Sequence, residues 1–170
     1  RFTLSSLPAG DFPSIEDSIG TSALVLKQPL LRRLIDRAGF AMAQQDVRYY
    51  LNGMLFEVSK GQLRAVATDG HRLAMCSLAI EVDEEARTQV IVPRKGDKEL
   101  SRLLGAEGDE EVSTVIGSNH IRVTSEKFTF TSKLVDGKFP DYERVLPKSA
   151  TNEVVGNRLD LRQAFLRTSI

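Results

Sequence analysis

Residues 50–82 have the sequence YLNGMLFEVSKGQLRAVATDGHRLAMCSLAIEV, and their pattern determines much of the architecture. Three runs, 50–58, 63–68 and 72–82, are rich in apolar side chains and predict strands. The pairs Lys60-Gly61 and Asp69-Gly70 separate them, and such pairs are typical of hairpin turns because glycine accepts a positive φ. We therefore expect three consecutive antiparallel strands.

A strand and a helix precede these three strands. Residues 23–27 predict the strand, and Pro29 suits the first turn of the helix. Apolar residues then recur at helical spacing, at Leu30, Leu31, Leu34, Ile35 and Ala38.

The same order follows after residue 82. Residues 89–92 predict a strand, and residues 96–104 predict a helix with Leu100, Leu103 and Leu104 on one face. Three more strands are expected at 112–116, 121–124 and 128–132. The chain therefore predicts an α+β fold, in which a strand-helix-three-strand unit is duplicated and two helices pack on one face of antiparallel sheet.

A longer repeat indicates more than one domain. FTLSSLPAGDFP at 2–13 aligns with TFTSKLVDGKFP at 129–140, and a basic amphipathic helical pattern follows each copy. We expect residues 1–20 to be the tail of a first domain, 21–142 a complete middle domain, and 143–170 a linker and the start of a third. Because the chain begins with Arg1 and ends inside a helical pattern, it is expected to be an internal fragment.

Composition narrows the class of protein. The hydrophobic fraction of 41% suits a globular core, and no run of apolar residues is long enough to predict a membrane span or a signal peptide. A lone Cys76 excludes an internal disulfide framework, so we expect a cytoplasmic protein. The 23 basic and 23 acidic residues argue against a simple basic DNA-coating protein but leave room for a basic stripe.

Catalysis and metal binding have weak support. His71 and Asp69 could form an acid–base pair, but they flank a tight turn and no nucleophile motif accompanies them. One cysteine and two distant histidines, His71 and His120, do not give a zinc spacing, and no phosphate-binding glycine loop is present. We expect no enzyme activity, metal or cofactor, and keep an enzyme using Asp69 and His71 as an alternative.

Basic residues gather on the predicted helices. They recur about one turn apart and predict a continuous positive surface that meets DNA phosphates without reading bases, although any single helix could simply be a solvated face. The residues concerned are Arg32, Arg33, Arg37, Arg94, Lys95, Lys98 and Arg102, with Arg158 and Arg162 on a third helix. Each helix is expected to bury an aliphatic face, and Asp97 is expected to weaken the field of the second one.

Two further clusters are candidates for binding. Gln45, Arg48, Tyr49 and Tyr50 combine basic and aromatic groups that could contact DNA or a peptide, although one tyrosine of the pair should be core if both lie on a strand. The segment FPDYERVLP at 139–147 could pack against its neighbours or form the wall of a peptide groove.

Four strings in the chain resemble the bacterial DNA polymerase III beta subunit family of DNA sliding clamps. They are QQDVRYYLNGMLFE at 44–57, ATDGHRLAMCS at 67–77, VIVPRKG at 90–96 and FTFTSKLVDGKFPDYERVLP at 128–147. The resemblance covers essentially the whole chain. It implies the DNA clamp fold, with three similar domains per subunit and two subunits joined head to tail in a ring whose hole is lined by helices.

The resemblance also implies binding sites. A pocket between the second and third domains would take a short peptide with apolar anchors and a glutamine, and Arg48, Tyr49 and Tyr50 would lie at its edge or touch single-stranded DNA. By match to the family's motifs, the pocket residues would be Leu51, Thr68, Gly70, His71, Arg72 and Leu73, with Pro140, Arg144 and Val145 from the linker.

The function that the resemblance implies is that of a processivity factor without catalysis of its own, within a complex that is a DNA-directed DNA polymerase. It would encircle double-stranded DNA without sequence specificity and dock polymerase subunits, the clamp loader and repair factors. The full-length protein would form a homodimer ring, which we do not expect this chain to close. The alternative is a peptide-binding adaptor that does not touch DNA.

Overall fold

The computed structural model describes residues 2–11, 23–81, 87–147 and 151–169. The chain divides into two compact units, Arg1–Phe139 and Pro140–Ile170. The first unit contains both helices and all eight strands of the predicted duplication, and the second contains a short 3-10 turn and one further helix.

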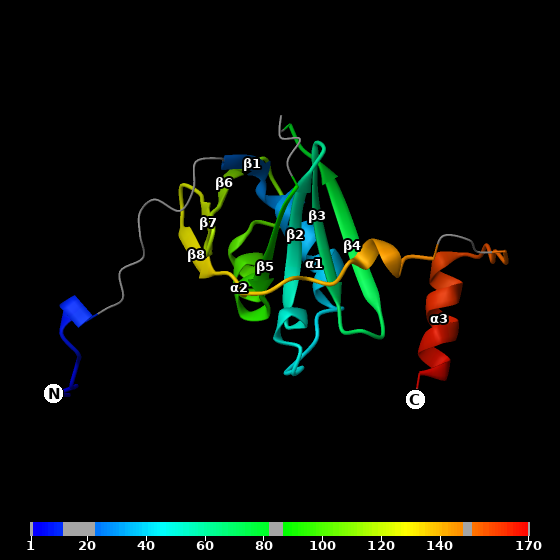
Figure 1. The fold of residues 1–170 in the computed structure, drawn as a ribbon, viewed down its shortest axis with the longest axis horizontal. Coiled ribbons are helices and arrows are strands. Elements are labelled where there is room, and N and C mark those ends of the chain that lie inside the picture. Colours follow the sequence, from blue (N-terminus) through cyan, green and yellow to red (C-terminus); the bar gives the residue numbers. More distant parts are fainter. Residues whose placement is uncertain (1, 12–22, 82–86, 148–150, 170) are drawn as a thin grey trace. The chain divides into compact units, whose positions relative to one another are not determined.

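The first unit has the predicted order of elements, written twice (Figure 1). The first half consists of β1 (Ala23–Lys27), α1 (Gln28–Gly39), β2 (Gly53–Ser59), β3 (Gln62–Thr68) and β4 (Leu73–Ala79). The second half consists of β5 (Thr88–Pro93), α2 (Arg94–Leu103), β6 (Glu111–Ile116), β7 (His120–Thr124) and β8 (Thr129–Lys133). Before them, residues 2–11 are exposed and hold only the 3-10 turn η1 (Ala9–Asp11).

The two predicted hairpin turns are present. Lys60 and Gly61 both have positive φ, 50° and 69°, which matches a two-residue type I′ turn between β2 and β3. Residues 69–72 connect β3 to β4, and Gly70 has a φ of 89°. Glycine fits there because a side chain rarely adopts that backbone conformation.

The strands form two antiparallel sheets, and the halves exchange their first strands. Sheet A has the order β1-β6-β7-β8 and sheet B the order β4-β3-β2-β5. Ala23 of the first half therefore lies opposite Val115 of the second, while Ile91 of the second half lies opposite Leu55 of the first. The sequence pattern predicted the strands but not this exchange.

The helices cover the sheets and bury a common core. Helix α1 contributes Leu31, Leu34, Ile35 and Ala38, all at most 3% exposed. Helix α2 contributes Leu100, and Leu104 directly after the helix is also buried, whereas Leu103, predicted on the same face, is 46% exposed. Burying one such leucine stabilises a fold by roughly 1.5–3 kcal/mol, so the two helices are anchored mainly by these contacts.

The strand predicted at 50–58 begins later than expected. Tyr49 and Tyr50 lie in the 3-10 turn η2 (Tyr49–Leu51), because Asn52 exchanges two hydrogen bonds with the backbone of Asp46 and closes a loop. Tyr49 is 56% exposed and Tyr50 is half-buried. The expectation that one tyrosine belongs to the core is therefore wrong.

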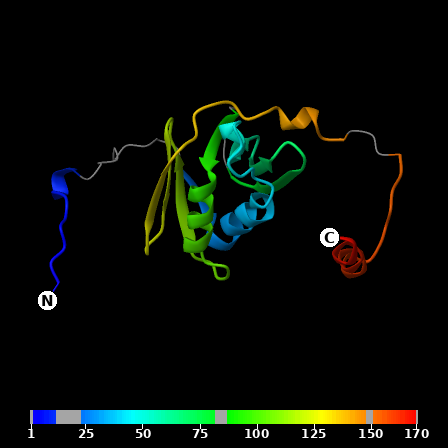
Figure 2. The ribbon, with the colours of Figure 1, turned by 90° about the horizontal axis from the view of Figure 1, so that it is seen from below.

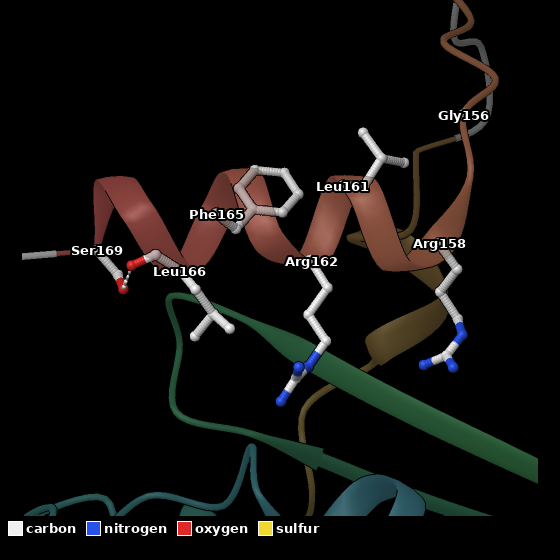
Figure 3. A pocket seen from close by; sticks show the side chains of 7 residues that line it. All are labelled: Gly156, Arg158, Leu161, Arg162, Phe165, Leu166 and Ser169. Carbon is white, nitrogen blue, oxygen red and sulfur yellow. Dashed lines mark hydrogen bonds between the residues drawn. The ribbon is translucent and has the colours of Figure 1, made fainter.

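The second unit contains η3 (Tyr142–Arg144) and α3 (Arg158–Thr168). The side chain of Asn157 caps α3 by accepting the backbone N–H groups of Leu159 and Asp160. Leu161 and Phe165 point to one side of α3, while Arg158, Arg162 and Leu166 point to another (Figure 3). No residue of α3 is buried, so the aliphatic face expected to be buried on this helix is exposed.

Candidate functional site

The turn between β3 and β4 is held by its own polar side chains. The Asp69 carboxylate accepts the backbone N–H groups of His71 at 2.9 Å and Arg72 at 3.0 Å, and its other oxygen accepts Arg72 Nε at 3.2 Å. The Thr68 hydroxyl accepts from Gly70 N and donates to the Arg72 carbonyl. The hydrogen bond from the His71 amide lowers the pKa of Asp69. The turn therefore presents its outer residues from a well-fixed backbone.

The alternative acid–base pair is not formed by this geometry. Asp69 directs its carboxylate at two backbone amides and Arg72, and within the described residues it has no hydrogen bond to the His71 imidazole. Over the same described part of the chain, no group of three potential metal ligands lies together.

Arg72 joins this turn to the end of α1. Its Nη2 donates to the Phe40 carbonyl at 2.9 Å, and its guanidinium carbon lies 5.5 Å from the centre of the Phe40 ring. Phe40 is 60% exposed. Sequence reasoning did not select Phe40, because the contact joins residues that are 32 positions apart.

The predicted pocket residues differ in accessibility. Gly70, His71 and Arg72 are exposed, Thr68 and Leu73 are half-buried, and Leu51 is only 2% exposed. Leu51 therefore belongs to the buried core and is not accessible to a bound peptide. In the second unit Pro140, Arg144 and Val145 are exposed, and Arg144 pairs with Asp141 at 2.8 Å.

The segment before η2 contains a compact ion pair. The Asp46 carboxylate accepts the Arg48 guanidinium through Nε at 3.0 Å and Nη2 at 2.7 Å, which lowers the pKa of Asp46 to about 2. Gln45 is exposed and has a φ of 56°. Tyr49 and Tyr50 contact each other edge to face, with ring centres 5.7 Å apart.

The two helices form one surface. They run antiparallel, since Gln28 at the start of α1 accepts from Gly105 after α2, and Arg94 at the start of α2 donates to the Met42 carbonyl after α1. Figure 2 shows them side by side. Four exposed cations on this surface have no salt bridge to any described residue, namely Arg33, Arg37, Lys95 and Lys98.

The other three basic residues predicted on these two helices, in contrast, form hydrogen bonds or a salt bridge within the helix layer. Arg32 donates to the Leu104 carbonyl at 3.0 Å, where a positive charge stabilises the carboxyl end of α2. Arg94 is half-buried and donates to Met42. Arg102 pairs with Glu99 at 2.8 Å but remains exposed. Arg32 and Arg94 therefore contribute to the joint between the helices.

Asp97 does not weaken the field of α2 as a surface charge. It is fully buried, and neither carboxylate oxygen has a hydrogen-bond partner in the described structure. Burial raises its pKa well above the usual value and outweighs the opposite effect of the nearby Met54 backbone amide, so the neutral form is favoured. The expectation for Asp97 is corrected accordingly.

The duplicated strand-helix-three-strand unit, with two helices packed on antiparallel sheets, is the fold of DNA clamps. The chain belongs to the DNA polymerase III beta subunit family, since the model of that family's central domain matches residues 25–141. Among the described helices, none is long and apolar enough to cross a membrane.

Relatives and solved structures agree. The chain is 65% identical to the beta sliding clamp of Pseudomonas aeruginosa and 52% identical to that of Escherichia coli, in each case over the whole chain and 46% of the relative. A crystal structure of the P. aeruginosa protein matches 99% of the chain and 46% of its own, with a TM-score of 0.93 and 64% identity. A crystal structure of a Bacillus subtilis sliding clamp matches 96% of this chain and 43% of the clamp chain, with a TM-score of 0.89 and 29% sequence identity. The chain spans about half the length of the curated relatives it matches.

Proposed function

We propose that this chain is part of a sliding clamp, a processivity factor that encircles duplex DNA and holds a replicative polymerase on it. The names of its relatives support this proposal. The factor is not an enzyme; it acts through topology and binding, and the polymerase supplies the chemistry.

The observation that carries the proposal is the shared surface of α1 and α2. Arg33 and Arg37 on one helix, and Lys95 and Lys98 on its antiparallel neighbour, are exposed cations without salt bridges to described residues. Such cations attract phosphates by replacing condensed counterions, and they do so without regard to base sequence. Contacts that are individually weak and indifferent to sequence allow a protein to slide.

Partners would dock on the turn between β3 and β4. Gly70, His71 and Arg72 are exposed there on a fixed backbone, and a few well-placed contacts can dominate binding of a short peptide. The partners proposed for this turn are polymerase subunits, the clamp loader and repair factors. A crystal structure of the P. aeruginosa sliding clamp bound to griselimycin supports ligand binding by a clamp of this family.

The complete protein would have three such domains and form a homodimer ring. Residues 21–142 would be the middle domain, which the match of the central-domain model over 25–141 supports. Residues 1–20 and 143–170 would belong to its neighbours. Phe2, Leu4 and Leu7 are at least 84% exposed, and Phe165 is 71% exposed, as expected for residues that further parts of those domains would cover.

Retention on circular DNA tests the clamp. The complete protein, loaded by a clamp loader onto nicked circular DNA, should stay bound until the circle is cut, because a closed ring leaves only over an end. Equal loss before and after linearisation would favour the adaptor without DNA contact.

The helix surface can be tested by matched lysine pairs. Replacing Lys95 and Lys98 with alanine should lower the slope of log affinity against log salt for duplex DNA by up to about 1.8, which is about 0.9 per phosphate contact. Lys133 and Lys138, which are exposed and belong to neither helix, provide the control pair and should leave the slope unchanged. Equal effects of the two pairs would contradict a helix-lined DNA surface.

A further inference from the structure

Asp46 is held in place by more than its ion pair. Its backbone N–H donates to Asn52 Oδ1 at 2.9 Å, and its carbonyl accepts from Asn52 Nδ2 at 2.8 Å. Its carboxylate also accepts the backbone N–H of Arg48 at 2.8 Å, the hydrogen bond of an Asx turn. The carboxylate thus has a fixed position from which it binds the Arg48 guanidinium at two nitrogens.

The same guanidinium contacts the β3–β4 turn. Arg48 Nη2 donates to the Asp69 carbonyl at 3.3 Å. A Cβ atom built on Gly70 would lie 3.1 Å from Arg48 Nη1, so the guanidinium covers this glycine closely. Arg48 therefore bridges two segments that are 21 residues apart, with the planar group oriented on one side by a carboxylate and resting on the turn on the other.

We infer that Asp46 is a positioning residue of the peptide site: by orienting Arg48 against Asp69 and Gly70, it keeps the 68–73 turn in the form that binds a peptide. This inference rests on the proposed docking function. It also moves Arg48 from the group of DNA contacts to the support of the peptide site, because its Nε and Nη2 are already bound within the protein. Since Arg48 lowers the pKa of Asp46 to about 2, the carboxylate is ionised throughout the neutral range.

Asp46→Asn in the complete protein tests the inference. The probe is a fluorescent synthetic peptide that contains a glutamine and leucine anchors, with affinity measured by anisotropy. We expect about a three- to fivefold loss of affinity, the range that an exposed charge-assisted contact supports. Asp109→Asn is the control, because it removes a carboxylate from a different ion pair, its 2.6 Å pair with Lys27. It should leave peptide affinity unchanged.

A double-mutant cycle separates positioning from general structure. Arg48→Ala should cause a similar loss, and adding Asp46→Asn to it should cause no further loss, because Asp46 acts through Arg48. Additive losses, or equal affinities of Asp46→Asn and wild-type protein, would overturn the inference. Binding of single-stranded DNA should keep its salt slope in Arg48→Ala; a slope lowered by about 0.7 would return Arg48 to the DNA contacts.

A spectroscopic readout distinguishes this inference from the docking function itself. In protein labelled with ¹⁵N-arginine, the Arg48 Nε–H should be protected from solvent exchange in wild type and lose protection in Asp46→Asn, with an unchanged melting temperature. If the wild-type protein does not bind the peptide, the docking function fails. In that case, the exchange protection of the Arg48 Nε–H still tests whether Asp46 orients the guanidinium. An Nε–H that is unprotected in the wild-type protein would overturn this positioning role as well.

Discussion

Asp97 combines full burial with a carboxyl group that has no hydrogen-bond partner in the described structure. Its raised pKa has a definite consequence for stability. The unfolded chain ionises this group near pH 4, whereas the folded chain does so only at higher pH. The free energy of unfolding therefore falls as pH rises above about 4. Below that pH both states are protonated and the loss disappears.

Asp97→Val should therefore stabilise the protein by about 1–3 kcal/mol at pH 7 and by much less at pH 4. Urea unfolding at both pH values measures this difference. Asp136→Asn, which changes an exposed acid on the same unit, is the control and should leave the free energy of unfolding close to that of wild type. A stability gain of equal size at both pH values would argue that Asp97 is not buried in its neutral form.

The spacing of Asp97 contained a signal that its residue type obscured. It stands three residues before Leu100, which is buried on α2, and seven before Leu104, which is buried directly after the helix. It therefore falls on the buried stripe. A charged residue type suggests the surface, and here tertiary packing prevailed. The Asp46–Arg48 pair was likewise readable in part, since Asp-x-Arg suits an Asx turn, but its contact with Asp69 is long-range.

Among the elements, β2 departs most from simple alternation. Six consecutive residues from its start are buried, on both faces of sheet B. On the outer face, the chain after β8 returns along the sheet, where Val135 N–H donates to the Ile91 carbonyl and Phe139 is buried. The strand was predictable from its apolar content. The packing of the segment after β8 against its second face was not predictable, because no local sequence pattern indicates such a long-range contact.

Glu57 is the charged residue within this covered strand, and it is 1% exposed. Its carboxylate accepts from Arg64 at 3.3 Å, Arg87 Nε at 2.7 Å and Gln89 at 2.6 Å. The arginines are 30% and 46% exposed, so solvent screens them and reduces the cost of losing the carboxylate.

Glu57→Gln should destabilise the protein by about 1–3 kcal/mol, less than the roughly 3–5 kcal/mol typical of breaking a fully buried pair. Chemical denaturation at pH 7 is the measurement, and Glu81→Gln, an exposed acid after β4, is the control. If both variants unfold at the same denaturant concentration as wild type, the cluster around Glu57 does not stabilise sheet B.

For the whole molecule, the order of elements was predictable and the pairing was not. Local turn signals gave β2, β3 and β4 as consecutive neighbours, as observed. The pairing of β1 with β6 joins Ala23 to Val115, and that of β5 with β2 joins Ile91 to Leu55, so no turn between the paired strands announces either contact. The DNA surface depends on the same long-range arrangement, because it requires α1 and α2 to be adjacent.

Because the halves exchange their first strands, each four-stranded sheet contains strands from both halves of the unit. If the chain is cut between β4 and β5, the two pieces should stay associated through a gel-filtration column and unfold in one transition. Made separately, each piece should give little ordered signal by circular dichroism, and mixing should restore it, since a three-stranded remnant leaves an edge and a core face open. Independent melting of the pieces would contradict this. Such interdependence would suit a split reporter, in which signal arises only when both pieces meet.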